Sequence, residues 1–258
     1  NADYVVMGYR FGTVPTGLYS RGFELVVNTI NQLNAPSTKI AVPVLARLQD
    51  DPPRFNEYLL AGQRVLLFAL VPVLGVGGAL AVPLVDIALG PGWAAAVPFV
   101  QVLAIAAATD KVLGYSTWWF ALARGRTDVS LRASLLSSAF LIVGIVVGSS
   151  WGPIGIAWGY AAGGLGAWLS GLLLFWRLAG APSGRLFVNA VKMVLLNAAP
   201  VAASLLASAW LMELGTLPHL LLGLAIYAGT WAVCVLAVPP FRAEMRSTAS
   251  VLRQLRSR

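Results

Sequence analysis

Long apolar segments make up most of the chain, and the connections between them alternate in charge. Lysine and arginine gather in every second connection and at the carboxyl end, whereas the connections at 85–93, 149–153 and 213–219 contain neither. A bilayer is crossed by ~20 mostly apolar residues, and short loops rich in lysine and arginine stay in the cytoplasm. The pattern predicts several membrane spans, with the basic connections and the carboxyl terminus in the cytoplasm. The segments lie near residues 1–14, 17–46, 60–84, 94–122, 133–148, 154–176, 188–212 and 217–238.

Composition narrows the fold class and the partners. The mean hydropathy is +0.77 and only 11% of the residues are charged. Inside hydrocarbon the backbone must satisfy its own hydrogen bonds, and the alternation typical of a barrel strand is absent. We therefore predict an all-α, polytopic helical membrane protein. The net charge of +8 would suggest nucleic acid in a soluble protein, but these charges lie beside the spans, so we expect the lipid bilayer as the partner instead.

Residues that bind metals or perform catalysis are scarce. Cys234 is the only cysteine and His219 the only histidine, so neither a disulfide nor a thiolate metal site can form. No serine–histidine–aspartate set and no glycine-rich phosphate loop can be assembled from the other residues. The sequence predicts no cofactor, no metal and no catalytic residue.

A polar stripe runs along the second segment. Its members fall within an arc of about 100° if each helical residue turns ~100°. A membrane helix with one polar face normally turns that face toward a bundle interior or an aqueous cavity. A structural ladder is the alternative, because the first two members are three residues apart and can pair with each other. The stripe consists of Arg21, Glu24, Asn28, Asn31, Gln32 and Lys39.

Three more charged residues are candidates for the same cavity. Asp110 and Lys111 lie within the fourth segment, and neighbouring residues of a helix point ~100° apart. We therefore expect Lys111 to extend toward the cytoplasmic headgroups and Asp110 to pair with a basic residue of the striped helix. For these two, a functional and a structural role are equally open. Arg10 lies near an outer connection, which makes sense if it faces an anionic ligand.

Small residues and prolines indicate where helices approach and bend. Glycines at four-residue spacing allow helix backbones to come close, with a hinge as the alternative reading. Prolines within spans permit bending. The glycines are Gly144, Gly148, Gly155, Gly159 and Gly163. The prolines expected to interrupt helices are Pro36, Pro43, Pro72 and Pro98.

The two ends of the chain also carry predictions. The chain starts at Asn1 with a segment too short to span, so we expect it to begin partway through a helix of a longer protein. Residues 240–258 form a basic cytoplasmic tail with five arginines. Its apolar residues can share one face of a short helix lying on the anionic leaflet; a solvated tail is the alternative.

Several sequence stretches together resemble one known family. They are the opening N-x-D-Y-x-x-x-G-Y-x-x-G pattern from Asn1 through Gly12, the continuation to Tyr19, Pro36, the VPVLARLQDD stretch at 42–51, and ALGPGWAAAVPFVQVLA at 88–104. In this order they resemble Wzx-type polysaccharide flippases of the multidrug/oligosaccharidyl-lipid/polysaccharide exporter superfamily. The likeness covers residues 1–124.

The resemblance implies an architecture and an activity. Members have two six-helix lobes around a central cavity, often followed by two extra helices. Residues 1–258 would then be the C-terminal lobe of a MATE-like transporter plus those two helices, with the missing N-terminal lobe as its partner. Such proteins flip polyprenyl-diphosphate-linked sugars across the bacterial inner membrane for lipopolysaccharide and other surface polysaccharides. The cations of the stripe would complement the diphosphate, and its amides would bind sugar hydroxyls.

Two other classes of function stay open. A lipid II or drug exporter of the same superfamily would share the fold. A membrane-embedded glycosyltransferase or polymer ligase is the enzyme alternative, but such enzymes need large outer loops, and those of this chain are short. Asp86, Glu213 and His219 are too scattered to form a convincing catalytic site. We therefore predict a transporter and not an enzyme.

Overall fold

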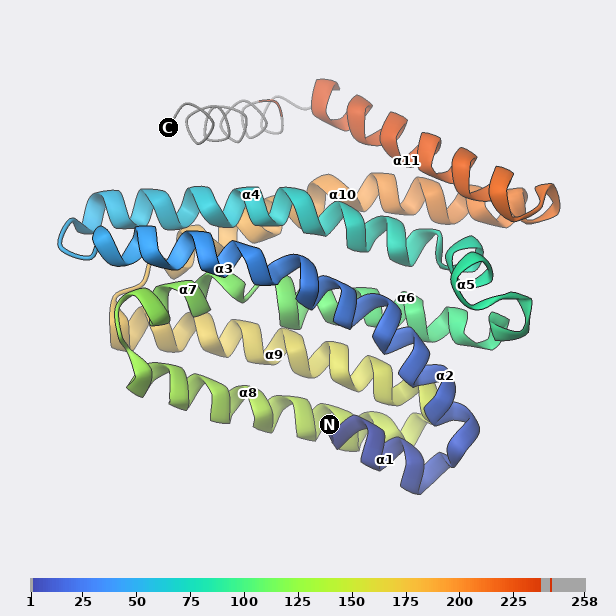
Figure 1. Ribbon diagram of the computed structural model, residues 1–258, viewed down its shortest axis with the longest axis horizontal. Helices are drawn as coiled ribbons and strands as arrows, with labels where there is room; N and C mark the ends of the chain where they lie inside the picture. The colour runs from blue at the N-terminus through green and yellow to red at the C-terminus, as the bar shows by residue number, and fades with distance from the viewer. Residues whose placement is uncertain (1, 238–241, 243–258) are drawn as a thin grey trace.

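The fold is a bundle of long helices, seen in a computed structural model that describes residues 2–237 and 242 (Figure 1). Every regular element of this described part is a helix, which confirms the prediction of an all-α polytopic protein. The amphipathic tail expected at 240–258 lies outside the described residues except for Arg242, so it stays a prediction.

The amino-terminal half begins with a short helix and continues as one long helical run. In this run α2 and α3 are joined by a π-helical turn, η1. The elements are α1 (Ala2–Phe11), α2 (Thr13–Phe23), η1 (Glu24–Asn28), α3 (Thr29–Arg47), α4 (Pro52–Ala79) and α5 (Ala81–Leu89).

The second half contains a further interrupted helix and then four long ones. A second π-helical turn, η3, separates α6 from α7. The elements are η2 (Pro91–Ala96), α6 (Val97–Ala107), η3 (Ala108–Val112), α7 (Tyr115–Ala123), α8 (Thr127–Gly148), η4 (Ser149–Trp151), α9 (Pro153–Ala179), α10 (Ser183–Leu211), η5 (Met212–Leu214) and α11 (Thr216–Ala237).

Six helical stretches of the described chain are long and apolar enough to cross a membrane. The run α2–η1–α3 is not among them, because its polar stripe lowers the hydropathy. The prediction of a multi-pass membrane protein is confirmed. The six stretches are Pro52–Ala79, Pro91–Ala123, Thr127–Trp151, Pro153–Ala179, Ser183–Leu214 and Thr216–Ala237.

The turns sort by charge onto two ends of the bundle. The α3–α4, α7–α8 and α9–α10 turns lie at one end, and the α1–α2, α8–α9 and α10–α11 turns lie at the other (Figure 1). The first end carries Arg47, Arg54, Arg124 and Arg126, whereas η4 and η5 carry no basic residue. The alternation of charge along the sequence therefore places these basic residues together at one end of the bundle. Which membrane side each end faces stays a prediction.

Several helices start before their apolar segments do. Helix α4 begins at Pro52, where Asp51 caps it by accepting a hydrogen bond from the Arg54 backbone N–H at 3.2 Å. An Asp cap followed by proline is a favourable helix start. Helices α8 and α10 also begin early, at Thr127 and Ser183, without a side-chain cap. Many of the basic residues near the ends of the apolar segments therefore lie within helices and not in the turns between them, among them Arg64, Arg132, Arg185 and Lys192.

The prolines interrupt less than expected. Pro36, Pro43 and Pro72 lie inside helices that continue past them. Pro98 lies in the first turn of α6, where its missing N–H is unneeded, so the prediction that it interrupts a helix was wrong. The break in the third apolar segment instead falls at Leu80, between α4 and α5.

Glycines bring α8 and α9 into backbone contact in the halves next to η4. A Cβ atom built on Gly159 would overlap the carbonyl oxygen of Gly144, and one on Gly148 would overlap that of Gly155. A Cβ on Gly163 would lie 2.7 Å from the Phe140 carbonyl oxygen. This confirms the prediction of close packing. Helix α8 has little other support, since only 11% of its span is buried.

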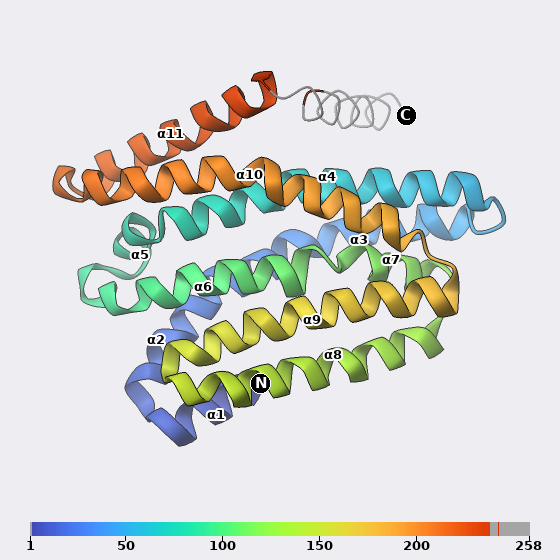
Figure 2. The same ribbon diagram turned by 180° about the vertical axis from the view of Figure 1, so that it is seen from behind.

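Polar side chains join the last two helices to each other. The Tyr227 hydroxyl donates to Asn197 Oδ1 at 2.6 Å, and Ser208 Oγ lies 2.8 Å from His219 Nε2. All four residues are buried. Helices α10 and α11 lie side by side in both ribbon views, with α10 against α4 (Figure 2). We call these contacts the α10–α11 ladder.

Candidate functional site: an exposed polar face and an adjoining cavity

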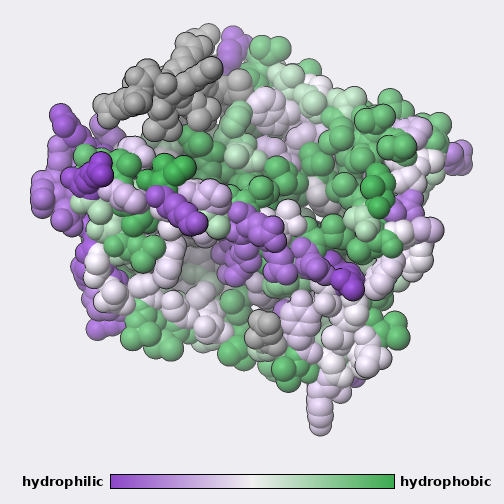
Figure 3. Space-filling model, in the orientation of Figure 1, coloured by the Kyte–Doolittle hydropathy of each residue, from purple (hydrophilic) through white to green (hydrophobic). Residues whose placement is uncertain are grey.

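The six stripe residues share one exposed face of α2, η1 and α3. Figure 3 shows a hydrophilic band that runs across the molecule over these elements. The opposite side of α3 is buried through Ile30, Asn34, Ala41 and Leu45. The stripe is exposed along its whole length, including where it crosses the π-helical turn η1. We call it the α2–α3 face; its members are Arg21, Glu24, Asn28, Asn31, Gln32 and Lys39.

Two members of the α2–α3 face pair with each other. Arg21 Nη1 lies 2.8 Å from Glu24 Oε2, and the two side chains are 52% and 61% exposed. Such exposed pairs contribute little to stability, so the pair leaves both groups available. The other four side chains make no hydrogen bond or ion pair with the described residues. The polar side chains of the α2–α3 face therefore do not satisfy one another by pairing along the helix.

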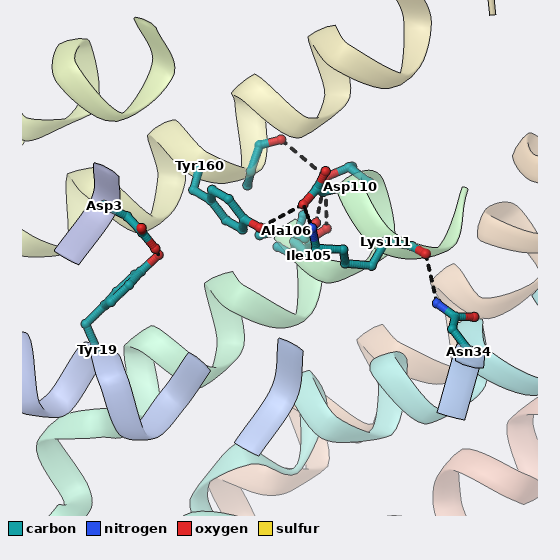
Figure 4. A network of polar contacts seen from close by, with 10 residues as sticks. Asp3, Tyr19, Asn34, Ile105, Ala106, Asp110, Lys111 and Tyr160 are labelled. Atoms are coloured by element: carbon teal, nitrogen blue, oxygen red, sulfur yellow. Dashed lines mark hydrogen bonds and ion pairs between the residues drawn. The ribbon is translucent and has the colours of Figure 1, made fainter. Parts of the chain in front are cut away.

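Asp110 and Lys111 form an ion pair on the π-helical turn η3. Lys111 Nζ lies 2.7 Å from Asp110 Oδ2, which also accepts a hydrogen bond from the Tyr160 hydroxyl at 2.7 Å (Figure 4). The expectations that Lys111 reaches the headgroups and that Asp110 pairs with the striped helix were therefore wrong. The flexible four-carbon stem of lysine lets it fold back onto its neighbour. The Asp110 side chain is only 10% exposed, which makes a close cation favourable.

Asn34 ties α3 to this turn, and sequence reasoning missed it. Its Nδ2 donates to the Lys111 carbonyl oxygen at 2.9 Å, from the buried side of α3. Its Oδ1 has no donor among the described residues. π-Helical turns are rare and recur at functional sites. Here a side chain of a neighbouring helix donates a hydrogen bond to a backbone carbonyl oxygen of such a turn. The sequence signal that could have revealed this contact is an amide side chain on the otherwise apolar side of the helix.

A second tyrosine–carboxylate pair lies deeper in the bundle. The Tyr19 hydroxyl donates to Asp3 Oδ2 at 2.8 Å, and both residues are buried. The ring of Phe23 lies 6.0 Å from that of Tyr19 and 6.1 Å from that of Tyr160. The Phe23 ring is therefore close to the tyrosine of each pair. Figure 4 shows how the Tyr19–Asp3 pair and the Tyr160–Asp110 pair lie relative to each other. Sequence reasoning used Asp3 only as part of a motif.

A cavity of about 420 Å³ opens between η3, α7, α8 and α9. Asp110 and Lys111 line it, whereas the α2–α3 face and Arg10 do not contribute to its lining. Arg10 lies at the end of α1, where its guanidinium donates to Ser149 Oγ. The lining residues are Thr109, Asp110, Lys111, Gly114, Tyr115, Thr117, Trp118, Ser130, Ala133, Ser134, Ser137, Ser138, Leu141, Gly164, Ala167, Trp168, Gly171 and Phe175.

Helix α3 contacts the cavity lining at the position next to Lys39. Thr38 donates to the Tyr115 hydroxyl at 3.3 Å and accepts from Trp119 Nε1 at 3.1 Å. Tyr115 itself lines the cavity. The neighbour of Lys39 in the sequence thus contacts a lining residue, whereas Arg10 lies at the end of α1, away from the cavity.

Comparison with known proteins gives the family context. Residues 1–98 match the family model described as polysaccharide biosynthesis protein. Over this region the chain is similar to polysaccharide biosynthesis proteins. It is 26% identical over 165 residues to teichuronic acid biosynthesis protein TuaB of Bacillus subtilis (strain 168), covering 62% of this chain and 33% of that protein.

Two further relatives agree. Identity is 27% over 151 residues to amylovoran biosynthesis protein AmsL of Erwinia amylovora, covering 58% of this chain and 38% of that protein. It is 27% over 164 residues to lipopolysaccharide biosynthesis protein WzxC of Escherichia coli (strain K12), covering 62% and 32%. The resemblance to Wzx-type proteins is confirmed. The chain spans about a third of the length of these relatives. No solved structure matches it.

Proposed function

We propose that the chain is the C-terminal lobe of a transporter that flips a polyprenyl-diphosphate-linked oligosaccharide across the bacterial inner membrane for surface polysaccharide synthesis. The observation that carries the proposal is the exposed α2–α3 face in a lobe whose other long helices are apolar. A charge at the centre of a bilayer costs about 2.5–3.5 kcal/mol on insertion scales. An aqueous cavity shared with an N-terminal lobe removes that cost.

The chemistry of the α2–α3 face suits such a substrate. The exposed guanidinium of Arg21 and the ammonium of Lys39 offer charge to a diphosphate, and arginine presents a planar fork of donors to phosphate oxygens. Asn28, Asn31 and Gln32 supply amides that donate to and accept from sugar hydroxyls. Arg10, at the outer end, would meet the anionic headgroup late in its passage.

A transport role without catalysis fits the other acidic groups and the histidine. Asp86 accepts a hydrogen bond from Thr216, and His219 is buried against Ser208. Glu213 lies on the turn η5, outside this pair of contacts. These contacts support a structural role for Asp86 and His219, which weighs against a glycosyltransferase or polymer ligase. A lipid II or drug exporter with the same fold remains the runner-up.

Export of surface polysaccharide by the intact protein tests the proposal. Arg21→Gln and Lys39→Gln should each lower surface polymer while protein abundance in the membrane is unchanged, because an exposed cavity charge contributes to binding and not to packing. Arg21→Lys keeps the charge and loses the fork. The double variant Arg21→Gln, Glu24→Gln removes the stranded acid; normal export by this variant would contradict a binding role for Arg21.

Cysteine labelling tests the proposed orientation, with the carboxyl terminus in the cytoplasm. In a Cys234→Ser background, Ala88→Cys, Ser150→Cys and Leu214→Cys should react with an impermeant thiol reagent in whole cells. Thr127→Cys and Arg185→Cys should react only after the cells are opened. Labelling of the last two in whole cells would reverse the orientation.

A further inference from the structure

We infer that the cavity between α7, α8 and α9 is a subsite for an uncharged sugar ring of the transported molecule. The inference rests on the proposed transport function and assigns the two ends of the substrate to different places. The cavity volume of about 420 Å³ falls within the ~300–1,000 Å³ range of small-molecule sites.

Helix α8 presents an open row of hydroxyls to the cavity. Ser130, Ser134, Ser137 and Ser138 all line it, and at ~100° per residue they occupy about 100° of the helix. None of these hydroxyls makes a hydrogen bond within the described part of the chain. Each can donate one hydrogen bond and accept two. Such a surface suits a ligand that carries hydroxyls in several directions.

The outward side of the same helical stretch carries leucines beside Arg132. Leu131 and Leu135 are 63% and 65% exposed, as expected of side chains that face lipid. The serine row is therefore not simply part of a helix that is polar on every side. Farther along α8, Gly144 and Gly148 continue the serine side and pack on α9. One side of α8 is thus closed against α9 in its outer half and open in its inner half.

Aromatic rings complete the lining. Trp118 is 45% exposed, and Tyr115 and Phe175 line the same cavity. A sugar ring has apolar C–H faces between its hydroxyls, and indole and phenol rings offer broad apolar faces with one polar edge. Hydroxyls on one wall and aromatic rings on another match both kinds of surface on a sugar.

The charge of the lining argues against the diphosphate. Asp110 and Lys111 are the only charged lining residues among those described, and they neutralise each other at 2.7 Å. The α2–α3 face instead carries Arg21, whose pairing with Glu24 is exposed, and Lys39. An apolar chain also fits poorly here, whereas the groove of about 590 Å³ between α4, α6, α9 and α10 is lined mostly by Val, Leu, Ala and Gly. A neutral polyol is the remaining class.

Site-directed labelling of the intact protein separates the two ends of the substrate. In a Cys234→Ser background, Ser137→Cys reports on the cavity and Ala35→Cys, at an exposed position beside the polar residues of α3, reports on the α2–α3 face. Ser150→Cys, at the outer turn, is the control. The probes are undecaprenyl diphosphate without sugar and the lipid-linked oligosaccharide extracted from the producing strain. Maleimide labelling rates are measured with each probe at saturation.

We expect the sugar-bearing lipid to slow labelling of Ser137→Cys severalfold and the sugar-free lipid to leave it unchanged. Both lipids should slow labelling of Ala35→Cys, and neither should affect Ser150→Cys. If Ala35→Cys is protected but Ser137→Cys is not, or if the sugar-free lipid protects both, the subsite is wrong and the transport proposal stands. If neither lipid protects Ala35→Cys, the proposed function fails with it.

Export gives a second readout that does not require cysteine. Trp118→Leu should reduce surface polymer and Trp118→Phe should retain most of it, because phenylalanine keeps an aromatic face. Equal export by both variants at equal abundance would contradict the proposal that the aromatic face of Trp118 contacts the sugar ring.

Discussion

The α10–α11 ladder and the α2–α3 face contain similar polar side chains in opposite situations. In the ladder, Asn197 and His219 are buried and each has a polar side chain as partner within 2.8 Å. On the face, Asn28 and Asn31 are exposed and make no hydrogen bond with the described residues. A buried and paired amide fixes a helix in place, whereas an exposed and unpaired amide in a membrane protein implies water or a ligand opposite it.

Helix α8 contains both situations on one side. Its half next to η4 meets α9 through glycine backbones, and the serines of its other half line the cavity. Changes to residues in packed contacts should therefore reduce stability, and changes to residues that face the cavity should reduce transport. The following changes test that division, from the largest expected effect to the smallest.

Gly159→Val should prevent the intact protein from accumulating in the membrane. The first side-chain carbon would already overlap the Gly144 carbonyl oxygen, so the two backbones must separate. Overpacking alone costs about 1–3 kcal/mol, and α8 has little other support. Membrane abundance and detergent melting measure the effect. Gly171→Val, at an α9 glycine whose Cβ meets nothing within 4 Å, is the control; equal losses would contradict the tight seam.

Asn197→Leu should lower the unfolding free energy by about 1–3 kcal/mol, because the buried Tyr227 hydroxyl loses its acceptor. Adding Tyr227→Phe should restore part of the loss, since both polar groups are then gone. Thermal unfolding in detergent measures both variants. A double variant as unstable as the two single losses added together would show that the Tyr227–Asn197 hydrogen bond is not what holds α11.

The triple variant Asn28→Ala, Asn31→Ala, Gln32→Ala should change the unfolding free energy by no more than about 0.5 kcal/mol per site. Export of surface polymer should nevertheless fall severalfold. The same melting assay and a surface-polymer assay are compared on one membrane preparation. A large loss of stability with normal export per folded molecule would reverse the division between the two regions.

Glu24→Gln should have the smallest effect on stability, below about 1 kcal/mol, because the Arg21–Glu24 pair is exposed. The residual effect should disappear at high salt. Melting temperatures at low and high ionic strength measure it. A large effect that persists at high salt would mean that the pair is buried in the intact protein.

The glycine contact between α8 and α9 follows from regular helical spacing and could be predicted from the sequence. The exposed stripe on α2 and α3 was also predicted, although the π-helical turn η1 interrupts its helix. The Asp110–Lys111 pair was mispredicted because a regular helix was assumed where η3 is a π-helical turn. The Asn34 hydrogen bond to Lys111 joins positions 77 residues apart, and no spacing rule relates two such distant residues. The serine row of α8 was visible in the sequence, but its cavity depends on how α8 and α9 diverge.

Photocrosslinking from Asn31 tests the central claim most directly. A photoreactive phenylalanine derivative replaces Asn31 in the intact protein, in cells that make the polysaccharide precursor. Leu206, which is 73% exposed on α10, serves as the matched position on an apolar surface. The account predicts that position 31 captures the sugar-bearing polyprenyl diphosphate lipid and that position 206 captures phospholipid. Capture of phospholipid alone at both positions would show that the α2–α3 face borders the bilayer, and would contradict the account.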